Sequence, residues 1–114
     1  MASEIQEAEK LARSYFDRIR SRDPAVADLF HEDGSIIGLG GVKSGRETIR
    51  EFYKASIEAA SPTPALVGEI LVNGSRATAE INIALADGSN VHAMDLFVVE
   101  DGLIRSLTYF IADH

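Results

Sequence analysis

One acidic side chain lies inside an otherwise uncharged, apolar run of the sequence. Asp95 sits between Met94 and Leu96, and an ionised carboxylate there is costly unless it is paired or kept neutral. Tyr15 and Tyr53 fall on the apolar stripes of two expected helices and bring phenol groups into the same interior. A neutral carboxylic acid and a phenol that face one point both donate hydrogen bonds to an oxygen that gains negative charge. The three residues therefore predict a site that stabilises an enolate-like oxyanion.

The same residues allow a purely structural interpretation. In that case Asp95 is a carboxylate bonded to the backbone or to a tyrosine, and Tyr15 and Tyr53 are core aromatics with satisfied hydroxyl groups. Tyr109 either lines the same interior as Asp95 or fills the core. The other side chains expected to line the pocket are Phe30, Gly38, Phe52, Phe97, Leu107, Tyr109 and Ile111.

Several other chemistries are excluded by composition and spacing. The chain has no cysteine, which removes disulfides and thiolate nucleophiles. His31, His92 and His114 stand too far apart for a His-x-His or His-Glu-x-x-His zinc pattern. The glycines near residue 40 match neither the dinucleotide-binding pattern nor the P-loop pattern, and no G-x-S-x-G is present. We therefore expect no metal and no cofactor.

Composition indicates the general class of the protein. The 114 residues are the usual size of one domain with one core, so a single domain over residues 1–114 is expected. The 11 Lys and Arg against 18 Asp and Glu give a net charge of −7, which disfavours binding to nucleic acid or to an anionic membrane surface. No stretch of about 18 apolar residues is present, and the first residues lack the features of a signal peptide. We expect a cytoplasmic protein without nucleic-acid or membrane partners.

The first half of the chain has the periodicity of helices. Apolar residues at three- and four-residue steps predict a helix over residues 3–21, with Ser3 and Gln6 spaced as a capping box. Asp23 before a proline predicts the start of a second, short helix. Ser44 and Glu47 repeat the capping-box spacing, and a third helix follows until the prolines at 62 and 64 end it. The two tyrosines fall on the first and third of these helices.

The second half has the two-residue periodicity of strands. Four runs, at residues 66–72, 76–86, 91–99 and 103–111, are separated by short turns that contain glycine. A further short strand is expected at 35–37, followed by a glycine-rich loop at 38–41. Helices followed by an antiparallel meander predict an α+β architecture with the helices on one face of the sheet.

The run at 91–99 is apolar on both of its faces. Alternate residues from Val91 share the face of Asp95, and the opposite face shows His92, Met94 and further apolar residues. An antiparallel strand with one wet face usually alternates apolar and polar residues, so the second apolar face indicates that something covers it. A second copy of the chain is the simplest cover, and a homodimer is therefore expected, with His92 at the interface or on the surface.

The order of helices and strands resembles the nuclear transport factor 2-like superfamily, which includes ketosteroid isomerases and SnoaL-like polyketide cyclases. The matching stretches, which look most like bacterial ketosteroid isomerases, are Tyr15 in the first helix, Leu29-Phe30 followed by acidic residues, Gly45-Arg46, the run from Ile49 to Tyr53, and Met94-Asp95 leading to Phe97 and Gly102. The resemblance implies a cone-shaped, cystatin-like fold, in which three N-terminal helices pack on a curved, mainly antiparallel sheet.

The resemblance also implies roles for individual residues. Tyr15 falls where the isomerases place the tyrosine of the oxyanion hole, Asp95 where they place a protonated aspartic acid, and Tyr53 where a tyrosine supports the first by hydrogen bonding. Gly38 stands where they carry the aspartate that moves the proton. Because glycine cannot carry a proton, the chain is a poor isomerase or a binding protein unless another residue is the base. The candidates for that base are His31, Glu32, Asp33, Asp113 and His114.

Three functions are compatible with these residues. The first is an enzyme of the isomerase, lyase or cyclase type that stabilises an enolate-like oxygen with Tyr15 and Asp95. The second is a non-catalytic pocket for a small apolar ligand that carries a phenol or ketone oxygen. The third is a dimeric interaction module whose cavity is incidental, since one fold of this kind supports many functions.

Overall fold

The computed structural model describes residues 2–38 and 40–112. Its elements, in chain order, are α1 (Ala2–Arg20), the 3-10 helix η1 (Pro24–Leu29), β1 (Phe30–Gly38), β2 (Gly41–Ser44), α2 (Arg46–Ala60), β3 (Thr63–Leu66), β4 (Leu71–Asn73), β5 (Arg76–Ala84), β6 (Asn90–Glu100) and β7 (Leu103–Ile111). Within these described ranges, no helix is both long enough and apolar enough to cross a membrane.

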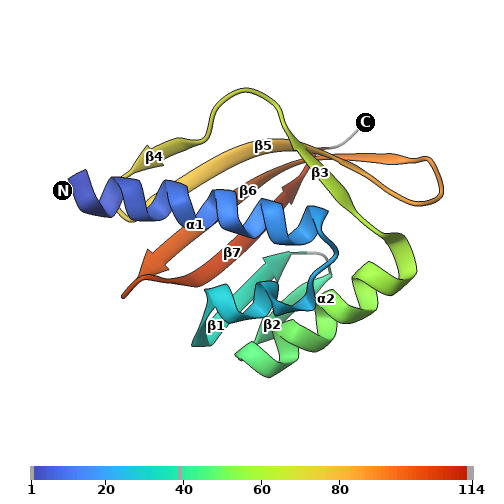
Figure 1. Ribbon diagram of the computed structural model, residues 1–114, viewed down its shortest axis with the longest axis horizontal. Coiled ribbons are helices and arrows are strands. Elements are labelled where there is room, and N and C mark those ends of the chain that lie inside the picture. Colours follow the sequence, from blue (N-terminus) through green and yellow to red (C-terminus); the bar gives the residue numbers. More distant parts are fainter. Residues whose placement is uncertain (1, 39, 113–114) are drawn as a thin grey trace.

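One curved sheet forms the base of the molecule, and both α-helices lie on the same face of it (Figure 1). Its strand order is β2-β1-β7-β6-β5-β3, and β4 pairs with β5 beyond this path. Strands β5, β6 and β7 form the expected antiparallel meander, whereas β1 pairs with β7 in parallel. The predicted α+β architecture with a mainly antiparallel sheet is confirmed.

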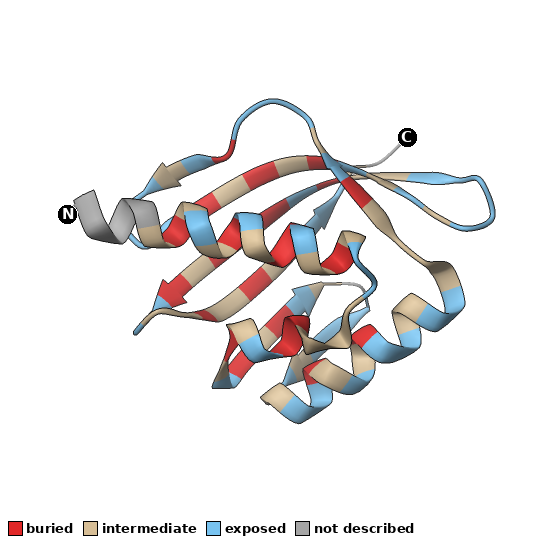
Figure 2. Cartoon of the chain, viewed as in Figure 1, coloured by how far each residue is buried: buried red, intermediate tan, exposed pale blue. Residues whose placement is uncertain are grey.

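Helix α1 confirms the first predicted helix. Its apolar stripe packs on the sheet, with Ala12, Tyr15 and Phe16 buried, as the red positions along the helix in Figure 2 show. The capping box predicted at Ser3 and Gln6 falls on side chains outside the described part of the structure. The burial of this stripe fixes Tyr15 on the inner side of the helix.

The second predicted helix is the short 3-10 segment η1. The carboxylate of Asp23 caps it by accepting a hydrogen bond from the backbone N–H of Ala25 at 2.9 Å. The third predicted helix is α2, but the cap predicted for it is wrong. Gly45 takes the cap position, and the Ser44 hydroxyl instead lies 3.2 Å from the hydroxyl of Ser35 across β1 and β2. Helix α2 ends, as expected, just before the prolines.

The region between η1 and α2 contains more strand than the sequence predicts. The predicted strand at 35–37 extends over all of β1, and the predicted loop at 38–41 is the turn of a hairpin that pairs Gly38 with Gly41. The acidic residues at 32 and 33 belong to β1, although they lie where its parallel pairing with β7 shifts register, between the pair Phe30 and Ile104 and the pair Ser35 and Ser106. Local composition does not reveal such a distant partner.

The strand predicted at 66–72 is divided into two. Strands β3 and β4 both pair with β5, and residues 67–70 between them belong to neither strand. The other three predicted strands are confirmed to within two residues at each end. On β6 the alternation is also confirmed, because Ala93, Asp95 and Phe97 face the helices and are buried, whereas Met94 on the opposite face is 40% exposed.

Candidate functional site

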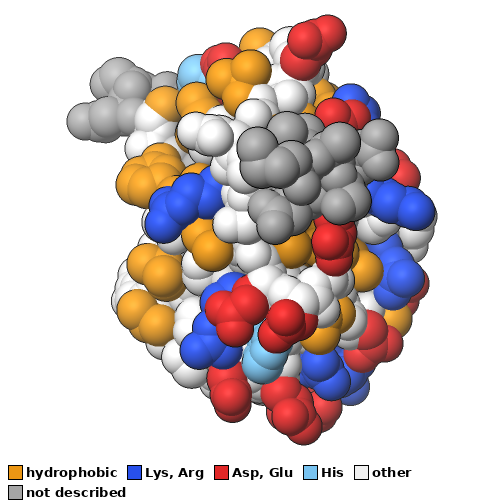
Figure 3. Space-filling view, turned by 90° about the vertical axis from the view of Figure 1, so that its left-hand side faces the viewer, with side chains coloured by type: hydrophobic (Ala, Val, Ile, Leu, Met, Phe, Trp, Pro, Cys, Tyr) orange, Lys and Arg blue, Asp and Glu red, His pale blue; other side chains and the backbone are white. Residues whose placement is uncertain are grey.

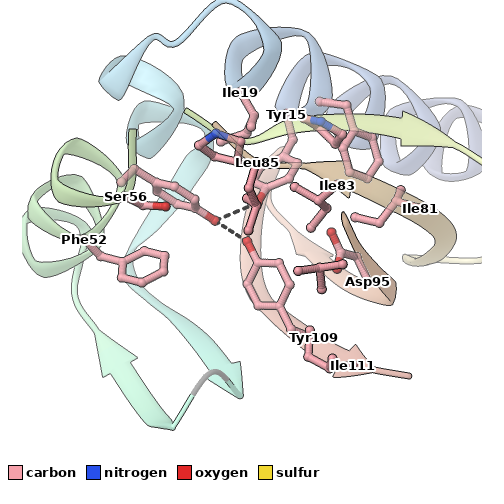
Figure 4. A pocket seen from close by; sticks show the side chains of 15 residues that line it. Tyr15, Ile19, Phe52, Ser56, Ile81, Ile83, Leu85, Asp95, Tyr109 and Ile111 are labelled. Carbon is pink, nitrogen blue, oxygen red and sulfur yellow. Dashed lines mark hydrogen bonds between the residues drawn. The ribbon is translucent and has the colours of Figure 1, made fainter. Parts of the chain in front are cut away.

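An apolar cavity of about 170 Å³ lies between α1, α2 and the inner face of the sheet (Figure 4). The residues that line it are Tyr15, Phe16, Ile19, Phe52, Tyr53, Ser56, Pro62, Pro64, Ile81, Ile83, Leu85, Val91, Asp95, Tyr109 and Ile111. Ten of these fifteen side chains are pure hydrocarbon. The polar groups of the cavity are therefore confined to three tyrosines, one serine and one aspartic acid.

Three tyrosine hydroxyls meet in the cavity (Figure 4). Tyr15 comes from α1, Tyr53 from α2 and Tyr109 from β7, and all three side chains are buried. The Tyr53 hydroxyl lies 2.8 Å from that of Tyr15 and 2.7 Å from that of Tyr109. The hydroxyls of Tyr15 and Tyr109 are also hydrogen-bonded to each other. The three oxygens form a closed group, which we call the tyrosine triangle.

The tyrosine triangle satisfies its own hydroxyl protons. Each phenol has one O–H to donate, and its oxygen can also accept. Three mutual hydrogen bonds use all three protons when they run in one direction around the triangle. The resting triangle therefore offers oxygen lone pairs, and no free O–H, to the cavity. A ligand oxygen gains a tyrosine donor only when one O–H turns away from its neighbour.

Burial keeps these three phenols neutral. Removal from water is the largest cause that raises the pKa of Tyr15, Tyr53 and Tyr109 above the usual value of 10.0. The nearby charge of Asp95 acts in the same direction on all three pKa values. The tyrosines are therefore hydrogen-bonding groups and not proton acceptors at physiological pH.

Asp95 supplies a fourth polar group from the middle of β6. It lies directly opposite Tyr109 on β7, its side chain is fully buried, and neither carboxyl oxygen has a hydrogen-bond partner among the described residues. Loss of hydration raises the pKa of Asp95 to about 8. About nine molecules in ten therefore carry Asp95 as the neutral acid at pH 7, with a free O–H.

The acid and the triangle complement each other. A ligand oxygen that reaches Asp95 receives a hydrogen bond from its O–H, and no hydrogen bond within the protein has to break, because the carboxyl group has no partner among the described residues. A tyrosine donates to a ligand oxygen only when its O–H turns out of the triangle, which breaks one bond of the triangle. Both bonds form away from water, where they are electrostatically stronger. The site can therefore hold a carbonyl, phenol or enolate oxygen.

The three residues on which the predicted site depends do lie together. Tyr15, Tyr53 and Asp95 all line the cavity. The structural alternative of a bonded carboxylate is wrong for Asp95, whereas the alternative of satisfied hydroxyls is confirmed for the two tyrosines. The other predicted lining residues that the structure places in the wall are Phe52, Tyr109 and Ile111.

Part of the wall was not predicted from the sequence. Phe16 and Ile19 share the predicted stripe of Tyr15, and Ile81 and Ile83 share one face of the run at 76–86, so these residues carry a usable signal. The prolines at 62 and 64 carry no such signal, because only the path of the chain through β3 brings them to the cavity.

Three aromatic or aliphatic residues predicted to line the pocket are core residues. Phe30, Phe97 and Leu107 have no exposed surface, and none of them reaches the cavity. Phe97 and Phe30 pack edge-on against the ring of Tyr15, with ring centroids 5.3 Å and 6.4 Å away. Leu107 pairs with Phe97 across the sheet. The two phenylalanines hold the tyrosine in place, and none of the three residues lines the cavity.

Gly38 also lies outside the wall, and its backbone explains why. Its φ angle is +108°, and a Cβ atom built there would lie 2.7 Å from the backbone carbonyl oxygen of Tyr109. Only glycine allows β1 to approach β7 this closely. The position therefore has no room for a side chain, and the base that the isomerases carry there has no equivalent at this position.

The other candidates for a base do not reach the cavity. Three of these candidates lie near the start of β1, next to the start of β7: His31, Glu32 and Asp33. The cavity is lined instead by Tyr109 and Ile111, near the end of β7. Figure 3 faces the end of the molecule that carries the β6–β7 turn, and Asp and Glu side chains gather on its lower part. Asp113 and His114 lie outside the described residues. Asp95 is the one carboxyl group among the described residues of the cavity wall.

A second group of polar side chains lies around His31. Its ring and the carboxylates of Glu100 and Asp101 offer ligand atoms within 4.8 Å of one another. However, the Nδ1 atom of His31 accepts a hydrogen bond from the backbone N–H of Asp33 at 3.3 Å, which leaves the proton of the neutral ring on Nε2. The ring is therefore not prepared as a metal ligand, and the cavity is the stronger candidate for a site.

Comparisons with known proteins agree with this architecture. The family model of the SnoaL-like domain matches residues 12–107. A candidate ketosteroid isomerase from Kribbella flavida superposes with a TM-score of 0.85 and 24% identity, over 96% of this chain and 81% of that chain. A candidate polyketide cyclase from Sinorhizobium meliloti superposes with a TM-score of 0.80 and 25% identity, over 88% of this chain and 93% of that chain. A nuclear transport factor 2-like protein of unknown function from Mesorhizobium loti superposes with a TM-score of 0.84 and 24% identity, over 96% of this chain and 93% of that chain. No curated protein matches the chain in sequence. The expected nuclear transport factor 2-like fold is confirmed.

Proposed function

Because this chain belongs to the SnoaL-like domain family, we propose that it is a small-molecule enzyme of the isomerase, lyase or cyclase type. The cavity binds a compound whose carbonyl group becomes an enolate, and Tyr15 and Asp95 stabilise the enolate oxygen. Two of the similar solved structures are candidates for ketosteroid isomerisation and polyketide cyclisation, which supports a reaction of this kind.

One observation carries the proposal. Asp95 is fully buried in the wall of an apolar cavity and has no hydrogen-bond partner among the described residues. A buried polar group without a partner costs about 1–3 kcal/mol of stability. A fold that needed only a packed core at this position would be more stable with leucine. A side chain that finds its partner in a ligand accounts for the carboxyl group.

The tyrosine triangle adds a preference for a charged oxygen. To donate to a ligand, Tyr15 must give up a neutral hydrogen bond worth about 0.5–1.5 kcal/mol. A ketone returns a bond of the same kind, so the exchange gains little. An enolate returns a charge-assisted bond worth about 1.5–3 kcal/mol. The triangle therefore favours the enolate over the ketone, which is the preference that accelerates enolate formation.

The pH dependence of the activity shows whether Asp95 is a hydrogen-bond donor or a base. If the neutral acid donates to the enolate oxygen, activity falls as the pH rises through the pKa of Asp95, about 8. If the carboxylate removes the proton, activity rises through the same pH. Asp95→Asn keeps an N–H donor but cannot accept a proton, so it retains activity in the first case alone. We propose the first role.

The test is the isomerisation of 3-cyclohexen-1-one to its conjugated isomer, followed by the absorbance of the enone. Tyr15→Phe and Asp95→Leu should each lower kcat/KM by about 10²–10³-fold, as expected for the loss of one oxyanion donor. Asp33→Asn is the control, because Asp33 is exposed at the far end of the sheet. Turnover that is equal in the wild type and in both cavity variants refutes the proposal.

A second candidate function is a non-catalytic binding protein for a small apolar ligand with one oxygen. Gly38 favours this function, because the carbonyl of Tyr109 excludes a side chain at the position of the missing base. Binding of p-cresol that weakens in Tyr15→Phe, without turnover of the ketone at any pH, would identify the protein as such a binder.

We also propose that a second copy of the chain covers the outer face of the sheet. On that face Met94 of β6 lies beside Phe110 of β7, and the two side chains are 40% and 55% exposed. Thr108 continues this surface between Leu96 of β6 and Ile37 of β1. A two-fold axis would place the apolar surface against its own copy, which is the usual geometry of homodimers. If the cavity were incidental, this face would be the functional surface.

A further inference from the structure

Resting on the proposed function, we infer that the ligand contains a single six-membered ring with one ketone, enol or phenol oxygen. Compounds with fused rings are excluded. The volume of the cavity, the rigidity of its walls and the placement of its polar groups all point to this class.

The volume of the cavity limits the size of the ligand. About 170 Å³ is available. An engineered protein cavity of about 150 Å³, lined by Leu, Ile and Phe, binds one benzene molecule, whereas sites for drug-sized ligands occupy about 300–1,000 Å³. The space here therefore suits one six-membered ring with a small substituent. Two or more fused rings need more room than this, so part of such a ligand would lie outside the cavity.

The walls that set this volume are packed parts of the fold. Phe16 of α1 and Ile81 of β5 are each only 1% exposed. Pro64 is buried in β3, where it pairs with Ile83 of β5. To enlarge the cavity on these sides, side chains of a close-packed interior would have to move. On these sides the limit on ligand size is therefore a property of the folded protein, whereas Ile111, which is 48% exposed, lines an open side of the cavity.

The polar groups of the cavity allow one ligand oxygen. Figure 4 shows the hydroxyls of Tyr15 and Tyr109 close together, with Asp95 on the same side of the cavity as Tyr109, and Ser56 on α2. Apart from Tyr53, the other lining side chains are hydrocarbon. A ring with one oxygen directs it to the acid and the triangle, and its carbon atoms meet hydrocarbon. A second polar substituent that points away from these polar groups, including Ser56, would be buried without a partner, at a cost of about 1–3 kcal/mol.

A series of phenols tests the inference, because the phenol group is constant and only the ring system grows. The series is p-cresol with one ring, 2-naphthol with two and 2-phenanthrol with three, and the measurement is calorimetric titration of the full chain. We expect p-cresol to bind about tenfold or more tightly than 2-naphthol, since even one methylene in a fixed pocket changes binding by about 10–200-fold. For 2-phenanthrol we expect no measurable binding.

Widening the cavity should relax this selectivity. Ile83 is half-buried in the β5 wall, so Ile83→Ala enlarges the cavity and removes little of the core. The affinity for 2-naphthol should then rise by about tenfold or more. Ile57→Ala is the matched control, because Ile57 is half-buried on α2 and outside the lining. This control should leave the affinities for all three phenols unchanged, and thermal melting of both variants confirms that they are folded.

The outcomes separate this inference from the proposed function. If 2-naphthol or 2-phenanthrol binds the wild type as tightly as p-cresol and Tyr15→Phe weakens that binding, the size limit is wrong and the proposed function stands. The size limit is also overturned if Ile83→Ala leaves the affinity for 2-naphthol unchanged. If no phenol binds, or if Tyr15→Phe and Asp95→Leu leave the affinity for p-cresol unchanged, the proposed function fails together with the inference.

Discussion

Replacement of Asp95 by asparagine removes a titrating group from the dry wall of the cavity and keeps its shape. In the folded protein the pKa of Asp95 is about 8, against 3.8 for an ordinary aspartate. Between these two values the folded state keeps a proton that the unfolded chain releases. The stability that this proton supports is fully present below about pH 4 and is lost as the pH rises through about 8.

The size of the effect follows from the two pKa values. Each unit of difference corresponds to about 1.4 kcal/mol. The free energy of unfolding of the wild type should therefore fall by about 4 kcal/mol between pH 4 and pH 7, and by about 5 kcal/mol by pH 9. The asparagine does not titrate, and its unpartnered amide carries about the same cost, about 1–3 kcal/mol, as the unpartnered neutral acid of the wild type. The variant should therefore be about as stable as the wild type at pH 4 and about 5 kcal/mol more stable at pH 9.

Urea unfolding of both proteins between pH 4 and pH 9 measures this difference. All other titrating groups are shared by the two proteins, so the difference between their unfolding free energies reports on Asp95. The two stability curves should lie close together at pH 4 and separate as the pH rises, whereas the control Asp33→Asn should follow the wild-type curve. A difference between Asp95→Asn and the wild type that stays constant over this range would show an ordinary pKa for Asp95 and would refute the dry site.

Three further changes test other parts of the structure. Tyr15→Phe breaks two bonds of the tyrosine triangle and should lower the unfolding free energy by about 1–3 kcal/mol in urea; no loss would contradict the triangle. Gly38→Ala should cost about 1–3 kcal/mol more than Gly40→Ala, which has a similar positive φ but open space around its Cβ, and equal costs would contradict the close approach to β7. We expect the wild type to sediment as a dimer and the double variant Met94→Glu and Phe110→Glu to sediment as a monomer at the same concentration, and identical sedimentation would contradict the proposed interface.

The polar residues of the site are predictable from the sequence because each one departs from a local pattern. Asp95 interrupts an apolar strand, and Tyr15 and Tyr53 place hydroxyl groups on apolar helical stripes. Such exceptions are visible without knowledge of any contact. Tyr109 follows the ordinary alternation of its strand, so the sequence leaves two interpretations open for it. Its place in the triangle depends on how β7 docks against both helices.

The features that the sequence does not predict depend on distant partners. Apolar periodicity indicates that Phe30, Phe97 and Leu107 face inward, but it does not distinguish the wall of a cavity from a solid core. That distinction is made by the ring of Tyr15, against which the two phenylalanines pack. In the same way, β1 is longer than predicted because its parallel partner lies far along the chain.

Strand β7 occupies the interior of the sheet although it is the last strand of the chain. The β1–β2 hairpin cannot join β5 and β6 until residues 103–111 have been synthesised, since β7 separates them in the strand order. A ribosome delivers the N-terminal elements first, and here they remain without their central partner until translation is almost over. Tyr109 arrives on that same strand, so a nascent or prematurely terminated chain lacks both a continuous sheet and a complete cluster of hydroxyls.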